Sequence, residues 1–172
     1  MSNISLSPDA ILEQTNLTGA VADIQDSPAS PDANWLTAPG NNVATTVRTS
    51  LPTPPNNLNA GAALQQFRLW VRKTNHSTDP LMTVELYEDG ALIATLATGA
   101  GVSSISGQLL TYTWDAALLS AISGVDVECR ISGTSGGGKP TNRAALEIGA
   151  MAWDADYAVS TGPTLLLALV PA

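Results

Sequence analysis

The sequence has little of the chemistry that enzymes and metal proteins commonly use. It contains one cysteine, Cys129, and one histidine, His76, in 172 residues. These numbers exclude an internal disulfide and every zinc site built from several Cys or His ligands. Only 13% of the residues are charged, and seven Lys and Arg stand against 15 Asp and Glu, which gives a net charge of −8. A nucleic-acid partner is not expected, because binding phosphates needs a basic surface.

Long hydrophobic runs are also missing. The longest apolar stretch, 165–170, is far shorter than the ~20 residues of a membrane-spanning helix, so we expect no membrane partner. Residues 1–14 show no basic region followed by an apolar run, so no secretory signal is expected. The sequence therefore predicts synthesis in a cytoplasm without a signal peptide.

Short alternating segments indicate β-strands along most of the chain. The clearest is 66–72, in which Phe67, Leu69 and Val71 share one face and polar or bulky residues the other. Asp89-Gly90, between the alternating segments 82–87 and 91–96, is typical of a type I′ hairpin turn. Further strands are expected at 17–24, 43–51, 109–114, 125–131 and 145–153.

One short helix is expected after Asp115, which is a good N-cap residue. The half-polar strand faces predict an all-β fold, an antiparallel β-sandwich of about eight strands. A jelly-roll topology is the leading architecture and a closed barrel the second. We divide the chain into an N-terminal arm at 1–16, a sandwich domain at 17–158 and an apolar C-terminal tail at 159–172. Residues 1–15 and 160–172 are expected to lie outside the compact core.

Candidate catalytic groups are few. His76 lies in a polar loop without a neighbouring Ser or Cys nucleophile, so a Ser-His or Cys-His mechanism is not indicated. Glu85, Glu128 and Glu147 fall on outward strand faces, where a carboxylate pair for glycoside hydrolysis is a minor alternative to solvated acids. We expect no enzyme activity and no catalytic residues.

No cofactor is expected either. A structural calcium ion is a minor alternative, because several acids lie in or near loops and calcium prefers oxygen ligands. The acids considered for it are Asp23, Asp26, Asp32, Asp154 and Asp156.

The large aromatic residues are more informative. Trp70, Tyr87 and Trp153 share the polar parity of their strands, and Trp70 is flanked by Arg68 and Arg72. Trp and Arg are enriched in protein interfaces, so these five residues are candidate interface residues. Two alternatives remain: a second layer, a loop or a tail covers this face, or a β-bulge inverts the parity of a strand.

The C-terminal tail supplies the other candidate interface residues, Leu165, Leu166, Leu167 and Leu169. Burying each such side chain is worth roughly 1.5–3 kcal/mol, so the tail is expected to dock on protein. Pairing within its own sandwich and pairing with a neighbouring subunit are equally open.

Several segments resemble small virion structural proteins of tailed bacteriophages, of the head decoration (cement) type. They are residues 30–38, 51–54, 67–73, 86–90, 107–114, 127–130 and 147–150 together with Trp153. The resemblance implies a non-enzymatic β-sandwich on the outer surface of the virion capsid. Its implied partners are the major capsid protein and further copies of the chain, as a homotrimer.

An alternative comes from another functional class, because jelly-roll sandwiches also occur as carbohydrate-binding modules, including those of phage tails. In that case Trp35, Trp70, Tyr87 and Trp153 would stack on sugar rings.

Overall fold

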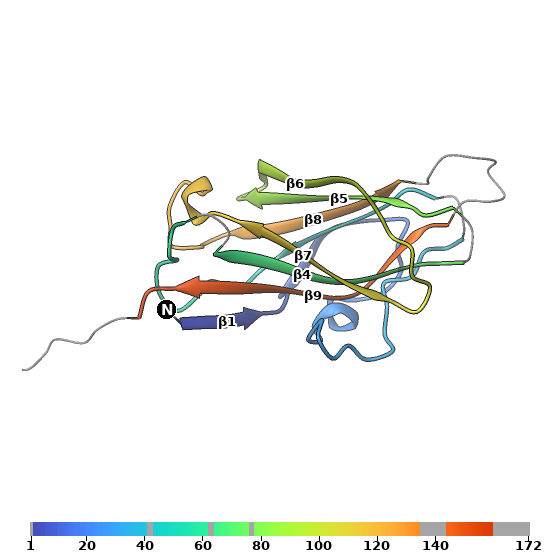
Figure 1. The fold of residues 1–172 in the computed structure, drawn as a ribbon, viewed down its shortest axis with the longest axis horizontal. Helices are drawn as coiled ribbons and strands as arrows, with labels where there is room; N and C mark the ends of the chain where they lie inside the picture. The colour runs from blue at the N-terminus through green and yellow to red at the C-terminus, as the bar shows by residue number, and fades with distance from the viewer. Residues whose placement is uncertain (1, 41–42, 62–63, 76–77, 135–143, 160–172) are drawn as a thin grey trace, which may run out of the picture.

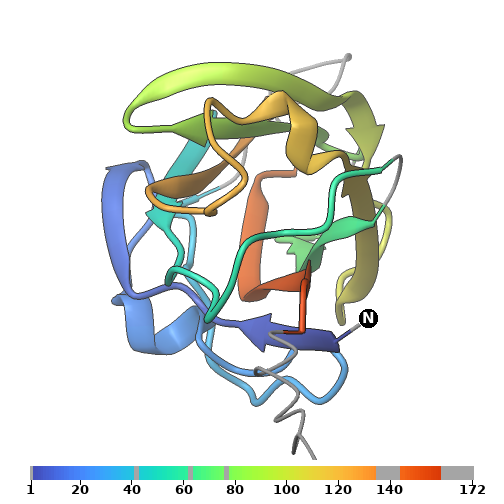
Figure 2. The ribbon, with the colours of Figure 1, turned by 90° about the vertical axis from the view of Figure 1, so that its left-hand side faces the viewer.

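The computed structural model describes residues 2–40, 43–61, 64–75, 78–134 and 144–159. Two antiparallel sheets pack face to face in this part of the chain (Figures 1 and 2). Sheet A contains, in spatial order, β1 (Ser2–Leu6), β9 (Leu146–Tyr157), β4 (Gln65–Lys73) and β7 (Gln108–Trp114). Sheet B contains β2 (Ala10–Thr15), β3 (Thr45–Ser50), β8 (Val127–Thr134), β5 (Leu81–Glu88) and β6 (Ala91–Gly101).

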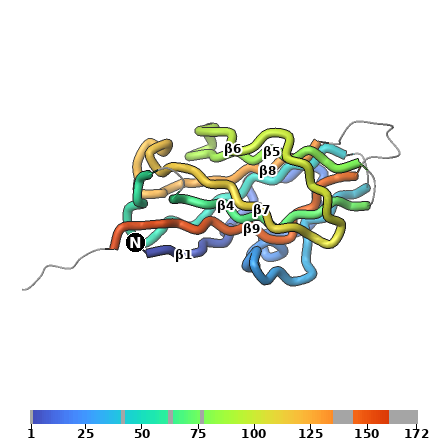
Figure 3. The backbone as a smooth tube through the Cα atoms, viewed as in Figure 1, coloured from blue at the N-terminus to red at the C-terminus, as the bar shows by residue number. Residues whose placement is uncertain are grey.

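The strand order is that of a jelly roll. If β2 is set aside as an added edge strand, successive strands of the remaining eight lie in opposite sheets, except for the hairpin of β5 and β6, which is the arrangement of two interlocked Greek keys. The innermost strands are β9 and β4 in sheet A and β3, β8 and β5 in sheet B. The tube view shows β9 next to β1 and β8 next to β5 (Figure 3). The predicted all-β antiparallel sandwich is therefore confirmed.

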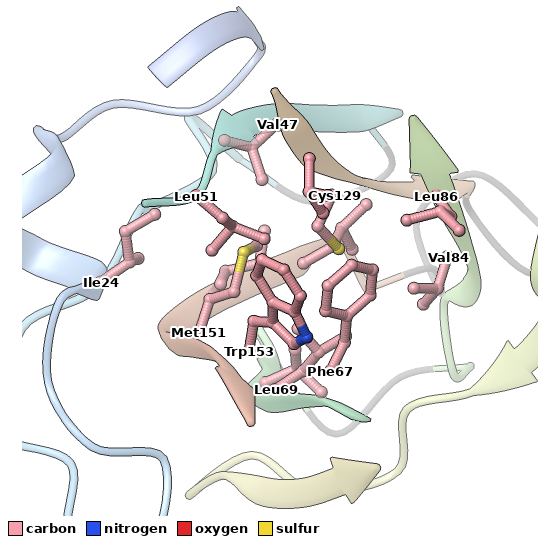
Figure 4. Close-up of a cluster of buried hydrophobic side chains, with 14 of the residues drawn as sticks. Ile24, Val47, Leu51, Phe67, Leu69, Val84, Leu86, Cys129, Met151 and Trp153 are labelled. Carbon is pink, nitrogen blue, oxygen red and sulfur yellow. The ribbon is translucent and has the colours of Figure 1, made fainter. Parts of the chain in front are cut away.

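The alternation read from the sequence places the core correctly in the central strands. Phe67, Leu69 and Val71 of β4 are fully buried, and the apolar set of β5 faces them from the opposite sheet (Figure 4). The turn at Asp89 and Gly90 has positive φ at both residues, 48° and 75°, as a type I′ hairpin requires.

The short helix is also confirmed. It is a single 3₁₀ turn, η2 (Ala116–Leu118), and the Asp115 side chain accepts a hydrogen bond from the Ala117 backbone N–H at 2.9 Å.

Two predictions about the N-terminal part are wrong. Residues 2–15 do not lie outside the core, because β1 pairs with β9 and β2 pairs with β3. The segment 17–24 is not a strand but ends in a 3₁₀ turn, η1 (Val21–Ile24), and only Thr18 makes a strand-like bridge, to Thr37. Ile24 is fully buried there, so the apolar residues of this segment reach the core without forming a strand.

The parity predicted for β9 is wrong beyond its first residues. Trp70 of β4 pairs with Ala150, whereas the next residue, Val71, pairs with Ile148, so Gly149 is an extra residue in a β-bulge. After the bulge, the side chains that were predicted to face outward face the core. Trp153 therefore points into the core and is fully buried (Figure 4). Its indole N–H donates to Gln65 Oε1 at 3.2 Å, which satisfies the polar end of the ring.

Candidate interaction surface

The outer face of sheet A carries most of the residues singled out in the sequence. Arg68, Trp70 and Arg72 alternate with the buried residues of β4 and are all partly exposed. Trp35, from the loop before β3, lies on the same face, next to Arg72. We refer to these four residues as the Trp70 face.

An arginine joins Trp35 to the sheet. The guanidinium carbon of Arg72 lies 4.0 Å from the centroid of the Trp35 ring, within the range of a cation–π contact. Arg72 Nε also donates to Glu147 Oε2 at 2.8 Å, and Glu147 Oε1 accepts from the Ala38 backbone N–H at 3.0 Å. The loop that carries Trp35 is therefore fixed to both β4 and β9.

The same loop takes the place of an edge strand along the first half of β9. Leu36 exchanges two backbone hydrogen bonds with Ile148, and the Trp35 ring lies against Gly149. A Cβ atom at Gly149 would be 2.8 Å from two ring atoms of Trp35, so the bulge residue has to be small.

The Trp70 ring packs closely against a glycine of the loop between β6 and β7. A Cβ atom at Gly107, in the loop between β6 and β7, would be 2.4 Å from Cε2 and Cζ2 of the Trp70 ring. Gly107 has φ of +114°, a conformation that favours glycine. Backbone of this loop thus covers part of Trp70, and the rest of the ring remains partly exposed.

Arg68 completes the face. It donates through Nη2 to Asp154 Oδ1 at 2.9 Å and to Ser5 Oγ at 3.2 Å, and it pairs across the sheet with Ala152. Ala150 and Ala152 are almost fully buried although they point outward. Trp70 and Arg68 lie beside these small residues of β9 and help to cover them.

The outer face of sheet B has a different character. Tyr87 lies here and not with Trp70, and the guanidinium carbon of Arg48 is 5.4 Å from its ring centroid. Arg48 Nη1 donates to Glu128 at 2.8 Å, and Arg130 Nη1 donates to Glu85 at 2.8 Å. The remaining acid of this network is Glu13 of β2, which pairs with both arginines.

The arginines on this face are not free cations. Burial disfavours the charge of Arg130, but its hydrogen bonds to Glu85 and Glu13 outweigh burial and raise the pKa of the guanidinium. The outward glutamates Glu85, Glu128 and Glu147 are each bound to an arginine, and Glu147 lies on the opposite sheet from the other two. They do not form a facing pair of carboxyl groups.

The structure thus divides the candidate interface residues. Arg68, Trp70 and Arg72 lie together, Tyr87 lies on the other sheet, and Trp153 belongs to the core. His76 and the tail residues Leu165, Leu166, Leu167 and Leu169 lie outside the described residues. The four aromatic residues of the carbohydrate alternative, Trp35, Trp70, Tyr87 and Trp153, therefore do not lie together on one sugar-binding platform.

The acids considered for calcium serve loop geometry and ion pairing. Asp23 accepts from the Ala20 N–H at 2.7 Å, Asp26 from the Asp32 N–H at 2.9 Å, and Asp32 from the Asn34 N–H at 2.6 Å. Asp154 binds Arg68, and Asp156 accepts from the side chain of Asn59. In the described ranges, no group of three or more His, Cys, Asp or Glu residues is placed to hold a metal ion.

Trp35 is the residue of this surface that strand patterns could not place. Its segment has no alternation, and its position follows from contacts with residues far along the chain, Arg72 and Gly149. The signals that were available were the small residues Gly107 and Gly149, which mark close approaches of backbone to an aromatic ring.

No protein-family model and no curated protein sequence matches the chain. Among solved structures, the CBM22-1 xylan-binding domain from Paenibacillus barcinonensis Xyn10C is similar, with 11% sequence identity, a TM-score of 0.36 and coverage of 91% of this chain and 95% of that one. At this level the likeness carries no argument about function. No helix within the described ranges is long and apolar enough to cross a membrane.

Proposed function

We propose that this chain is a non-enzymatic module that binds another protein through the Trp70 face. The observation that carries the proposal is the arrangement of Trp70 between Arg68 and Arg72, each held by a carboxylate of β9. Residues that dominate interface energies are enriched in Trp and Arg, and side chains fixed before binding lose little entropy on contact.

The charge of this face supports protein contact. Because Arg68 and Arg72 are paired with Asp154 and Glu147, the Trp70 face is close to neutral on a chain whose net charge is −8. Burying it against a partner does not require two like charges to meet, and no unpaired arginine of this face has to lose its hydration.

The more specific part of the proposal is a decoration (cement) protein on the outer surface of a tailed-phage capsid, with the major capsid protein as partner. This part rests on the sequence resemblance. An acidic protein is poorly suited to contact packaged DNA and is tolerated on the outside of a shell. The apolar tail at 159–172 remains a second candidate contact in this proposal.

The test is co-sedimentation with empty capsids purified from the phage that encodes the chain. Trp70→Ala is expected to weaken binding at least ~30-fold, the factor for a hot spot of about 2 kcal/mol. Tyr87→Ala is the matched control, since it removes a partly exposed aromatic from the opposite sheet and should change affinity less than about twofold. Equal affinities of wild type and Trp70→Ala would contradict the proposal.

A carbohydrate-binding function is the second candidate, because Trp35 and Trp70 remain on one face. It makes a distinct prediction on a glycan array: the wild-type chain binds, both Trp35→Ala and Trp70→Ala abolish binding, and capsids are not bound. That combination would replace the proposal of protein contact.

The tail is tested separately by ending the chain after Val159. If residues 160–172 contribute a contact, the truncated chain binds capsids more weakly than the full chain while Trp70→Ala weakens both. Unchanged affinity of the truncated chain would remove Leu165, Leu166, Leu167 and Leu169 from the interface.

A further inference from the structure

Two neighbouring edge strands of the sandwich contain no charged residue. The segment 90–114, which runs from the hairpin turn through β6 and β7, contains no Asp, Glu, Lys, Arg or His. β6 and β7 are edge strands of sheets B and A, and they contact each other on the same side of the sandwich (Figure 2). We call the exposed residues of 90–114 the neutral flank.

Apolar side chains are exposed along this flank. Leu92 of β6 is 51% exposed, Leu109 of β7 is 44% exposed, and Ile105 in the connecting loop is 39% exposed. Thr95, Thr98, Thr111 and Thr113 are exposed between them. Edge strands usually carry charged residues that prevent association, and both edges here lack them.

The rest of the described surface opposes self-association. Every Lys and Arg in the described ranges is paired with an acid of its own chain, so none of the five is a free positive group for a second copy. Several acids have no basic partner in these pairs, among them Asp23, Asp89 and Asp126. Two chains of net charge −8 therefore repel each other less through their neutral flanks than through surfaces that carry these acids.

We infer that the neutral flank is a self-association surface whose occupant is the neutral flank of a second copy of this chain. The contact is isologous, because the same patch serves on both molecules, and the closed product is a two-fold dimer. The homotrimer implied by the sequence resemblance would instead need the flank to meet a different and more acidic surface. The neutral flank adjoins the Trp70 face, because Leu109 of β7 pairs with Trp70 of β4, so Leu92 of β6 is the position that separates this inference from the proposed function.

The contact is expected to involve side chains and not a continuous ladder between β6 strands. The pairing of β6 with β5 is interrupted by three register shifts, and such bulges twist an edge away from regular pairing. A strand of 11 residues is roughly 36 Å long and the sheets are about 10 Å apart, which gives a patch of at least roughly 360 Å² per copy. This size is typical of weak interfaces, with a dissociation constant expected at about 1–100 µM.

The experiment measures mass against concentration for the full chain by sedimentation equilibrium. Leu92→Lys and Leu109→Lys are each expected to raise the dimer dissociation constant at least tenfold, since each substitution enters an isologous contact twice. Leu12→Lys on β2 and Leu118→Lys on η2 are matched controls, because these leucines are 46% and 47% exposed and lie off the neutral flank. All four variants change the net charge by the same unit, so general charge effects cancel.

Salt gives a second readout that does not depend on a variant. The dissociation constant of a dimer formed through the neutral flank should fall as the salt concentration rises. The reason is that salt screens the repulsion between two acidic chains, and no intermolecular ion pair is lost. A wild-type chain that stays monomeric over the whole concentration range overturns the inference. So does association that weakens with salt, or that Leu12→Lys disrupts as strongly as Leu92→Lys. Intact capsid binding by a monomeric Leu92→Lys chain would leave the proposed function standing.

Discussion

The Arg72 guanidinium lies 4.0 Å from the Trp35 ring centroid and at the same time donates to Glu147 at 2.8 Å. One side chain of β4 thus holds an aromatic residue of a loop and a nearly buried carboxylate of β9. The three groups come from positions 35, 72 and 147, so the contact closes two long loops of the chain. It fixes one end of the Trp70 face.

Arg72→Ala is expected to lower the free energy of unfolding by about 1–2 kcal/mol, since Glu147 loses its charged partner and Trp35 its stacking partner. Arg72→Lys should recover only part of this loss, because an ammonium group lacks the planar geometry of the contact. Urea unfolding measures both variants. An Arg72→Lys chain as stable as wild type would show that charge alone, without stacking, holds the loop.

Gly107→Ala is expected to displace Trp70. The added Cβ atom would lie 2.4 Å from the ring, and the backbone at φ of +114° disfavours residues with a Cβ. We expect lower thermal stability and weaker capsid binding. Gly101→Ala is the control, since a Cβ atom there meets nothing within 4 Å. Equal capsid affinity of the two variants would show that the position of Trp70 does not matter for binding.

Cys129 is expected to be unreactive in the folded protein. Its side chain is fully buried in β8, and burial, together with the negative charge of Glu85, raises the pKa of the thiol. Because the thiolate is the reactive form, a thiol reagent at pH 8 should modify Cys129 only as fast as the chain unfolds. The rate is followed with and without urea. Rapid modification of the native chain would contradict the described packing of sheet B.

Asp115 should contribute to acid sensitivity. Hydrogen bonds from the backbone N–H groups of Ala117 and Gly61 hold the pKa of its carboxyl below the ordinary value. A pKa lowered in the folded state stabilises the protein at neutral pH, and this contribution is lost as pH falls through the folded-state pKa. Asp115→Ala should therefore melt below wild type at pH 7, and the difference should shrink under acid conditions. A difference that does not change with pH would contradict this role.

Sequence patterns were sufficient for strands with a regular alternation. The side-chain orientation in β4, β5 and β8 follows from residues such as Leu69, Val84 and Ile131, which are buried as their positions predict. The bulge at Gly149 could not be read in the same way, because one extra residue reverses the direction of every side chain after it. A regular alternation without the bulge places Trp153 on the surface, whereas the bulge turns it into the core.

The edge strands β1 and β2 were missed because they are short and partly polar. In β1, Ile4 and Leu6 alternate with Asn3 and Ser5, a signal too short to distinguish a strand from a loop. Their pairing partners, β9 and β3, lie far along the chain, so long-range contacts decide their structure. The contact between Trp35 and Arg72 also joins residues far apart in the chain, so sequence patterns could not reveal it.

The central claim, that the Trp70 face contacts a capsid, is tested most directly by radical footprinting of the wild-type chain, free and bound to empty capsids. Trp114 and Trp153 are buried in the free chain and serve as internal references. If the Trp70 face contacts the capsid, oxidation of Trp70 and Trp35 falls several-fold on binding while that of Tyr87 is unchanged. Unchanged oxidation of Trp70, with protection of Tyr87, would contradict it.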